Sequence, residues 1–187
     1  MNLPNKLTLM RIILVPVFVL CFLKQWYFPA LIVFALASIT DALDGKIARK
    51  YNLITNFGKF LDPLADKVLV ISALCCFVEK GFMGCVPLII ISAREFMVSG
   101  LRLVTANEGV VVPAGIWGKL KTAFTMVSIV LVTVYAWLAG ITDTSMLNYD
   151  NIWYIVIQVL IWISTILTVI SGCVYLKAYW KYIDPSK

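Results

Sequence analysis

Long apolar runs separated by short polar segments make up most of this chain of 187 residues. Six of these runs come close to the length of about 20 residues that a helix needs to cross a bilayer. We predict spans over residues 1–23, 26–50, 58–78, 83–104, 117–140 and 152–175. No repeats or linkers separate them, so the pattern predicts an all-α polytopic membrane protein with six transmembrane helices. These would form one integral-membrane domain over residues 1–187.

The first run begins with positive charge and continues as an apolar core, as a secretory signal peptide does. No small-x-small cleavage site follows, since residues 24–28 read KQWYF. We therefore expect this segment to remain as the first span, with Asn5 or Thr8 as its capping residue.

The composition agrees with a membrane protein, and the distribution of charge predicts its orientation. Hydrophobic residues make up 61% of the chain, and its mean hydropathy is +0.93. With the N-terminus in the cytoplasm, all sixteen Lys and Arg residues except Lys24 and Lys80 lie on the cytoplasmic side. We therefore expect both termini in the cytoplasm. The net charge of +6 then indicates topology and attraction to anionic membrane lipids, not nucleic-acid binding.

One polar stretch, residues 41–67, lies between the second and third runs. It contains four of the ten acidic residues, Asp41, Asp44, Asp62 and Asp66. Spacings of three and four residues place each pair on one helical face, and a tight return would bring the pairs together. Four adjacent carboxylates repel one another unless a cation balances them, and Mg²⁺ or Mn²⁺ prefers oxygen ligands. The stretch therefore predicts a divalent metal site at the cytoplasmic membrane boundary.

A metal site of this kind needs an anionic substrate. Gly45 and Gly58 would allow a substrate close to the backbone, and Arg49 lies about one turn beyond Asp44. Two ions bridging a pyrophosphate would favour in-line phosphoryl transfer. The chain contains no histidine, so the general base would be a carboxylate or a metal-bound hydroxide.

A second polar group lies in the fourth and fifth runs and is cationic: Arg94, Arg102, Lys119 and Lys121. Arginine forks and lysine ammonium groups bind phosphate, so we interpret these residues as the site for the phosphate of a second substrate. Anchoring at the cytoplasmic side is an equal alternative for the two lysines. For Arg94 the alternative is neutralisation by Glu95.

The spacing of the polar stretch resembles a known signature. Asp41-x2-Asp44-Gly45-x2-Ala48-Arg49-x8-Gly58-x3-Asp62-x3-Asp66 is similar at every position to the motif of the CDP-alcohol phosphatidyltransferase family. The segments NLPNKLTLMR, SAREF, GLR and GIWGKLKT resemble those members that use glycerol 3-phosphate. Together the matching segments cover most of the first 125 residues, and the last two spans add only a hydrophobic pattern.

The resemblance implies the CDP-alcohol phosphotransferase fold and a reaction. CDP-diacylglycerol would transfer its phosphatidyl group to sn-glycerol 3-phosphate, giving phosphatidylglycerophosphate and CMP. The four aspartates would bind two ions, and Asp66 would also be the general base. The CDP group would contact Asn5, Thr8, Gly45, Arg49 and Gly58. The acceptor phosphate would contact Arg94, Arg102, Lys119 and Lys121. The resemblance also implies a homodimer in a bacterial inner or plasma membrane, and the distribution of charge predicts an active site that faces the cytoplasm.

Other functions compete with this one. Inositol phosphate, serine and phosphatidylglycerol are alternative acceptors in the same family, although the cations favour a phosphorylated acceptor. An intramembrane prenyltransferase also binds Mg²⁺-diphosphate through aspartates, but the fixed glycine positions argue against it. A transporter would place carboxylates near the bilayer centre on broken helices. The structural alternative for the aspartates is helix capping with surface ion pairs.

Overall fold

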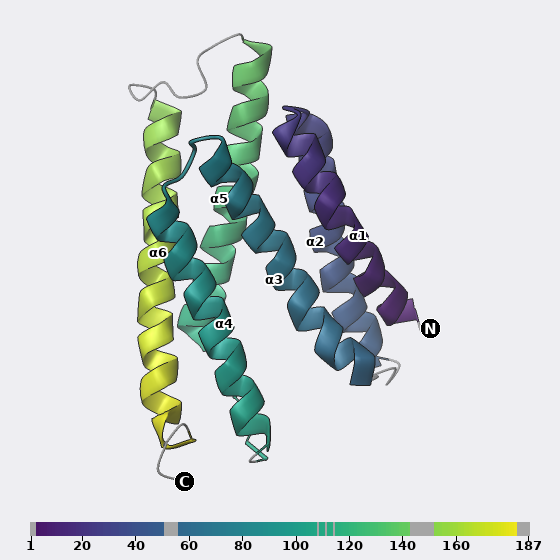
Figure 1. Ribbon diagram of the computed structural model, residues 1–187, viewed down its shortest axis with the longest axis vertical. Coiled ribbons are helices and arrows are strands. Elements are labelled where there is room, and N and C mark those ends of the chain that lie inside the picture. Colours follow the sequence, from purple (N-terminus) through teal and green to yellow (C-terminus); the bar gives the residue numbers. More distant parts are fainter. Residues whose placement is uncertain are drawn as a thin grey trace. The chain divides into compact units, whose positions relative to one another are not determined.

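The computed structural model describes residues 3–50, 56–107, 109–110, 112–113, 115–142 and 152–182. Inside these ranges, the side chains of residues 3–5, 42–50, 56–60, 62–63, 107 and 181 lie outside the description. The described ranges contain helices and no strand (Figure 1). The elements are α1 (Leu3–Leu23), α2 (Tyr27–Lys50), α3 (Asn56–Glu79), α4 (Cys85–Asn107), α5 (Ile116–Ile141), α6 (Ile152–Tyr179) and the 3₁₀ turn η1 (Trp180–Tyr182). The all-α prediction is confirmed for the part of the chain that is described.

Three of these helices end in the same way, at residues with left-handed backbone conformation. Gln25, Gly81 and Gly109 have φ angles of 64°, 76° and 73°. In each case the following residue donates its backbone N–H to the carbonyl five positions earlier, at 2.8 to 2.9 Å. This Schellman arrangement satisfies carbonyls that would otherwise lack partners at the helix end. It also explains why α4 continues past residue 104, the predicted end of its span, until Gly109 provides the stop.

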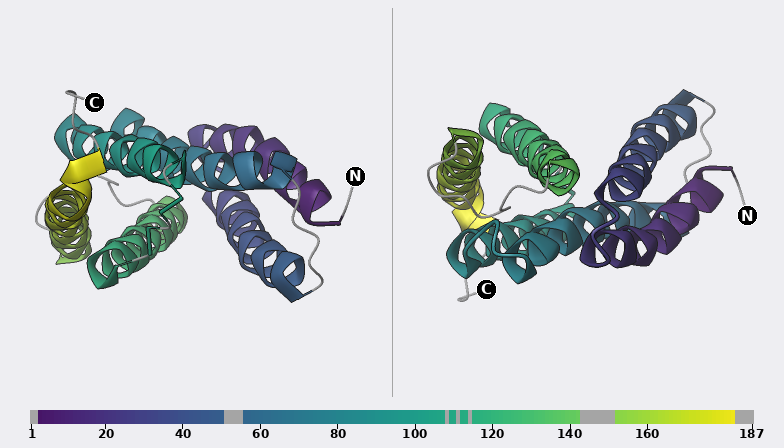
Figure 2. Two further views of the ribbon diagram at one scale, coloured as in Figure 1. Left: turned by 90° about the horizontal axis from the view of Figure 1, so that it is seen from below. Right: turned by 90° about the horizontal axis from the view of Figure 1, so that it is seen from above.

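The chain forms two compact units, and the first comprises Met1–Phe82 and Ile129–Asn148. In this unit α1 lies beside both α2 and α3, as Figures 1 and 2 show from three directions. Fully buried alanines such as Ala30 and Ala37 on α2 and Ala65 on α3 let neighbouring backbones approach closely. Aromatic rings fill the rest of the core, with centroids 5.1 to 5.9 Å apart among Phe18, Phe22, Tyr27, Phe34 and Phe77.

The second unit comprises Met83–Ser128 and Tyr149–Lys187, and within it α4 packs along α6. Its interior is more polar than that of the first unit. Buried hydroxyls line α6, and those of Thr165 and Thr168 donate to the carbonyl four residues earlier in the same helix. Ser164 on α6 also shares a hydrogen bond of 2.6 Å with Thr125 on α5. Hydroxyls that bond within or between helices can be buried without leaving an unsatisfied group.

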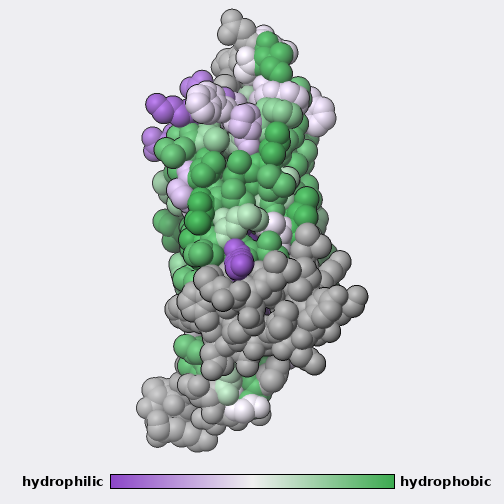
Figure 3. Space-filling model, turned by 90° about the vertical axis from the view of Figure 1, so that its right-hand side faces the viewer, coloured by the Kyte–Doolittle hydropathy of each residue, from purple (hydrophilic) through white to green (hydrophobic). Residues whose placement is uncertain are grey.

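Among the described residues, three helical segments are long and apolar enough to cross a membrane: Lys6–Leu23, Ile116–Ile141 and Ile152–Tyr179. In the face that Figure 3 presents, hydrophobic residues cover the middle region, and most of the hydrophilic residues in view gather near the upper end. Large apolar side chains such as Ile13, Leu20 and Ile89 are mostly exposed, as lipid contact requires. These are features of a membrane protein. The six spans, the orientation and the single domain stay predictions.

Candidate functional site

The predicted metal ligands lie on two helices of the first unit. Asp41 and Asp44 belong to α2, and Asp62 and Asp66 belong to α3. Both segments are helical, as the spacing predicted, and the shared face of each pair stays a prediction. The side chains of Asp41 and Asp66 are partly buried, whereas those of Asp44 and Asp62 lie outside the described residues. Among the described side chains, no three His, Cys, Asp or Glu residues converge on a point, so the four-aspartate site stays a prediction.

Asp41 has a partner that the sequence did not reveal. Nη1 of Arg11, on α1, lies 2.7 Å from Oδ1 of Asp41. The Arg11 side chain is completely buried, while that of Asp41 is 41% exposed. A buried guanidinium needs a counter-charge, and Asp41 provides it with one oxygen. The carboxylate retains its second oxygen, Oδ2, and enough exposure to contact another cation.

The residues predicted to bind CDP are described only in part. Thr8 lies on α1 one turn before Arg11 and is fully buried. Residues three apart share a helical face, so Thr8 and Arg11 point toward the same side of α1. The side chains of Asn5 and Arg49 and the surroundings of Gly45 and Gly58 lie outside the described residues.

The donor chemistry of the aspartates fits a divalent cation. All four predicted ligands offer only carboxylate oxygens, which Mg²⁺ and Mn²⁺ prefer. The ion pair between Arg11 and Asp41 is compatible with this assignment, because metal-ligating carboxylates are commonly held by a neighbouring polar or charged group.

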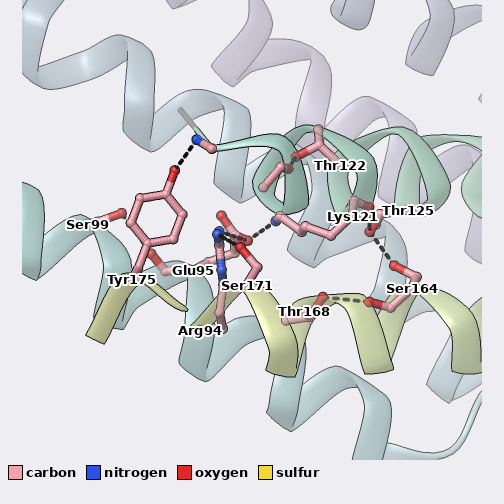
Figure 4. Close-up of polar contacts among 12 residues, drawn as sticks. Arg94, Glu95, Ser99, Lys121, Thr122, Thr125, Ser164, Thr168, Ser171 and Tyr175 are labelled. Carbon is pink, nitrogen blue, oxygen red and sulfur yellow. Dashed lines mark hydrogen bonds and ion pairs between the residues drawn. The ribbon is translucent and has the colours of Figure 1, made fainter. Parts of the chain in front are cut away.

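Two of the predicted cationic residues of the second unit, Arg94 and Lys121, converge on Glu95 (Figure 4). Nη1 of Arg94 lies 3.3 Å from Oε1 of Glu95, and Nζ of Lys121 contacts the same oxygen. All three side chains are largely buried, with exposures of 9% for Arg94, 8% for Lys121 and 15% for Glu95. Glu95 therefore neutralises Arg94, as one interpretation of the sequence suggested, and it also joins α4 to α5. Two cations share one carboxylate, so the cluster keeps a net positive charge.

α6 holds Arg94 from a second direction. Nη2 of Arg94 donates to Oγ of Ser171 at 2.5 Å. One turn further along α6, the centroid of the Tyr175 ring lies 5.4 Å from Cζ of Arg94 and 5.9 Å from Cζ of Arg102. Tyr175 is only 5% exposed. Its ring therefore contacts both arginines, and its contact with the buried Arg94 lies in a site with little water, where cation–π attraction is strongest.

The two remaining predicted cations are exposed. Arg102 contacts the cluster through Tyr175. Lys119 precedes Lys121 by two residues, which places the two ammonium groups on different faces of α5. The described contacts thus bring together Arg94, Arg102 and Lys121, and they do not include Lys119.

α6 contributes polar residues to the site, whereas the sequence predicted only a hydrophobic pattern for the last two spans. Ser164, Thr168, Ser171 and Tyr175 are all buried. They recur at intervals of four, three and four residues, which is a polar stripe along one face of an otherwise apolar helix. Polar residues in a membrane-length helix usually face the protein interior, so this stripe was the available sequence signal. For Arg11, the signal was a charged residue inside the first apolar run.

Comparisons with known proteins agree with these features. Residues 1–170 match the family model described as CDP-alcohol phosphatidyltransferase. Three relatives bear the name CDP-diacylglycerol–glycerol-3-phosphate 3-phosphatidyltransferase. The one from Bacillus subtilis is 37% identical over 99% of this chain and 98% of its own length. The one from Rickettsia bellii is 40% identical over 97% of both chains, and the one from Haemophilus influenzae is 37% identical over 94% and 92%. The chain belongs to the CDP-alcohol phosphatidyltransferase family.

Proposed function

We propose that this protein transfers the phosphatidyl group of CDP-diacylglycerol to a hydroxyl of sn-glycerol 3-phosphate, giving phosphatidylglycerophosphate and CMP. Family membership makes the chain a phosphatidyltransferase, and the names of its relatives support this acceptor. The observation that carries the proposal is the buried cationic cluster around Glu95. Burying cations costs free energy. The phosphate group of glycerol 3-phosphate would pair with these cations, whereas serine carries no phosphate.

On the donor side, the carboxylates of Asp41, Asp44, Asp62 and Asp66 would hold two Mg²⁺ or Mn²⁺ ions. When bound, the ions would supply positive charge that offsets the diphosphate and the leaving CMP. Arg11 would keep Asp41 oriented by holding one of its oxygens. Asn5, Thr8, Gly45, Arg49 and Gly58 would contact the CDP group.

The bond changes follow from the two substrates. The glycerol oxygen forms a bond to the phosphatidyl phosphorus, and the phosphoanhydride bond to CMP breaks. Asp66 accepts the proton that the attacking hydroxyl loses, as a general base. The partial burial of Asp66 on α3 keeps its carboxylate near both water and protein.

On the acceptor side, the phosphate of glycerol 3-phosphate would contact Arg94, Arg102, Lys119 and Lys121. Arg94 supports this role most directly. Its buried Nε has no hydrogen-bond partner among the described residues, although Nη1 and Nη2 are both engaged. A phosphate oxygen could satisfy such a donor, and leaving it unsatisfied is unfavourable.

The location of the reaction follows from the chemistry of the substrates. Glycerol 3-phosphate is soluble in water, while the acyl chains of CDP-diacylglycerol stay in lipid. We propose a single membrane domain with six spans, both termini in the cytoplasm and the site at the cytoplasmic face. A homodimer in the cell membrane is part of the same proposal.

CMP release by the purified protein tests this function. CDP-diacylglycerol and Mg²⁺ are supplied with glycerol 3-phosphate, inositol phosphate, serine or phosphatidylglycerol as acceptor. We expect release with glycerol 3-phosphate alone, its loss with EDTA, and its return with Mg²⁺ or Mn²⁺. Asp66→Asn should lower the rate about a hundredfold to ten-thousandfold, the usual contribution of a general base. Glu79→Gln, which changes an exposed acid at the C-terminal end of α3, serves as the control.

Two results would contradict the proposal. Release with a different acceptor would keep the family chemistry but refute the assigned acceptor. A folded Asp66→Asn variant that keeps more than about a tenth of the wild-type rate would refute the general base.

A further inference from the structure

We propose that Tyr175 on α6 is a positioning residue for the acceptor phosphate, a role that rests on the proposed function. Its ring holds Arg94 and Arg102 together, and its hydroxyl fastens the start of α5 beside them. Neither the family motif nor the predicted phosphate ligands include this residue.

The ring of Tyr175 contacts two arginines that lie far apart along α4. Arg94 and Arg102 are eight residues apart, a rise of about 12 Å along a helix. The helix backbone alone does not bring two guanidinium groups so separated onto one ligand, and their like charges repel. Tyr175 lies between α4 and the start of α5 with both Cζ atoms within 6 Å of its ring. A buried aromatic ring attracts both cations and so favours the side-chain conformations in which they approach each other.

The hydroxyl contact fixes the orientation of the ring. The Tyr175 hydroxyl accepts a hydrogen bond of 2.7 Å from the backbone N–H of Gly115 and donates one of 3.0 Å to the carbonyl of Pro113. Figure 4 shows the bond to Gly115. Both backbone groups lie immediately before α5, the helix that carries Lys119 and Lys121. Through its ring and its hydroxyl together, Tyr175 therefore links the two arginines of α4 to the helix with the two lysines.

Close packing at this point leaves little room for other arrangements. A Cβ atom placed on Gly118 would lie 3.5 Å from both Nη2 of Arg94 and the Tyr175 hydroxyl. α5 thus approaches the arginine and the tyrosine in its first turn. Side chains held in this way lose less freedom when a ligand binds, so the site binds its ligand more tightly.

A neighbouring tyrosine provides a matched control. Tyr179 lies one turn further along α6 and stacks on Tyr175, with ring centroids 6.4 Å apart. On its other side it contacts Tyr182, at 6.3 Å. Tyr179→Leu therefore removes a comparable ring from the same helix while leaving Tyr175 beside the two arginines.

The experiment measures the KM values of the full-length purified protein for both substrates, from CMP release. We expect Tyr175→Leu to raise the KM for glycerol 3-phosphate about tenfold, because the loss of two cation–π contacts to a buried ring weakens binding on this scale. The KM for CDP-diacylglycerol should stay within about twofold of wild type. Tyr175→Phe keeps the ring and should show an increase of only about threefold from the lost hydroxyl. Tyr179→Leu should retain wild-type KM values.

A second measurement separates this proposal from the proposed function. The thermal unfolding midpoint is recorded with and without inorganic phosphate, in the absence of any reaction. Phosphate should raise the midpoint of wild type and of Tyr179→Leu, and the shift should be lost in Tyr175→Leu. If wild type releases no CMP with glycerol 3-phosphate but shows this pattern, the acceptor assignment fails and the role of Tyr175 in binding phosphate stands.

The proposal is overturned by any of three outcomes. Tyr175→Leu could keep the wild-type KM for glycerol 3-phosphate and the wild-type response to phosphate. It could raise the KM for both substrates equally, which would indicate a general structural role. If Tyr175→Leu does not fold, Tyr175→Phe decides the matter, and an unchanged KM for glycerol 3-phosphate in that variant overturns the proposal.

Discussion

In the first unit a buried arginine holds a half-exposed aspartate, whereas in the second unit a largely buried glutamate holds two buried cations. Arg11 pairs with Asp41 in the one, and Glu95 pairs with Arg94 and Lys121 in the other. Each unit thus places a single opposite charge behind charges that are proposed to bind a ligand, a metal ion in the first unit and the acceptor phosphate in the second. The difference lies in burial, because Asp41 is 41% exposed and Arg94 only 9%.

Burial decides what each pair contributes. An exposed member of an ion pair keeps most of its hydration, so losing its partner affects its orientation more than the stability of the fold. A buried charge has given up its hydration, and losing its partner leaves it uncompensated. We therefore expect changes at Glu95 to act mainly on stability and changes at Arg11 to act on both stability and metal binding.

The largest effect on stability is expected from Glu95→Gln. The change leaves Arg94 and Lys121 without their carboxylate and should destabilise the protein by about 3 to 5 kcal/mol, the usual result of breaking a buried ion pair. Thermal or denaturant-induced unfolding in detergent measures this loss. Replacing Lys121 as well, in Glu95→Gln with Lys121→Met, should restore part of it because the second buried charge is then absent.

An unchanged stability of Glu95→Gln would contradict the expectation that the ion pairs of the second unit stabilise the fold. That result would mean that water or lipid head groups already compensate the two cations. Glu79→Gln removes an exposed carboxylate from α3 and should shift stability by less than about 0.5 kcal/mol, which makes it the control.

Much of this arrangement could be predicted from the sequence, but only the helices and the contacts between residues that are close together in the chain. The lengths of apolar runs predicted the helices to within a few residues, and the spacing of Asp41, Asp44, Asp62 and Asp66 predicted helical pairs correctly. The adjacent Arg94 and Glu95 also suggested their own contact. Their partners did not follow from spacing, since Lys121 lies 26 residues from Glu95 and Ser171 lies 77 residues from Arg94. Contacts of this kind depend on which helices pack together and in which register.

A smaller effect on stability, with a distinct effect on metal binding, is expected from Arg11→Met. Without the arginine, Asp41 loses the contact that orients its carboxylate, and loss of such a partner typically weakens metal affinity tenfold or more. We expect the Mg²⁺ concentration for half-maximal CMP release to rise about tenfold. Mn²⁺ binding followed by electron paramagnetic resonance, with no substrate present, should weaken to a similar extent. Arg11→Lys keeps the charge and should lie between Arg11→Met and wild type.

An unchanged Mn²⁺ affinity in folded Arg11→Met would contradict the assignment of Arg11 as a partner of the metal site. The ion pair would then serve only to join α1 to α2. Lys24→Met, at the exposed residue that follows the C-terminal end of α1, should leave Mn²⁺ affinity unchanged and controls for the loss of one positive charge.

The smallest effect, a change in the KM for glycerol 3-phosphate, is expected from Ser171→Ala. This variant tests whether a neutral hydroxyl contributes to binding beside the charged groups of the second unit. Ser171 accepts a hydrogen bond from Arg94, which keeps its contacts with Glu95 and Tyr175 when the hydroxyl is lost. A hydrogen bond of a charged group typically contributes about 1.5 kcal/mol or more, but here other contacts still restrain the arginine. We therefore expect the KM for glycerol 3-phosphate to rise only about threefold, with little change in kcat. Ser164→Ala is the matched control because its hydroxyl bonds to Thr125 on α5 and to no cation. An equal increase of this KM in Ser171→Ala and Ser164→Ala would mean that the polar stripe of α6 acts through helix packing. The second unit would then resemble the first, because its charged groups would be oriented by an ion pair alone.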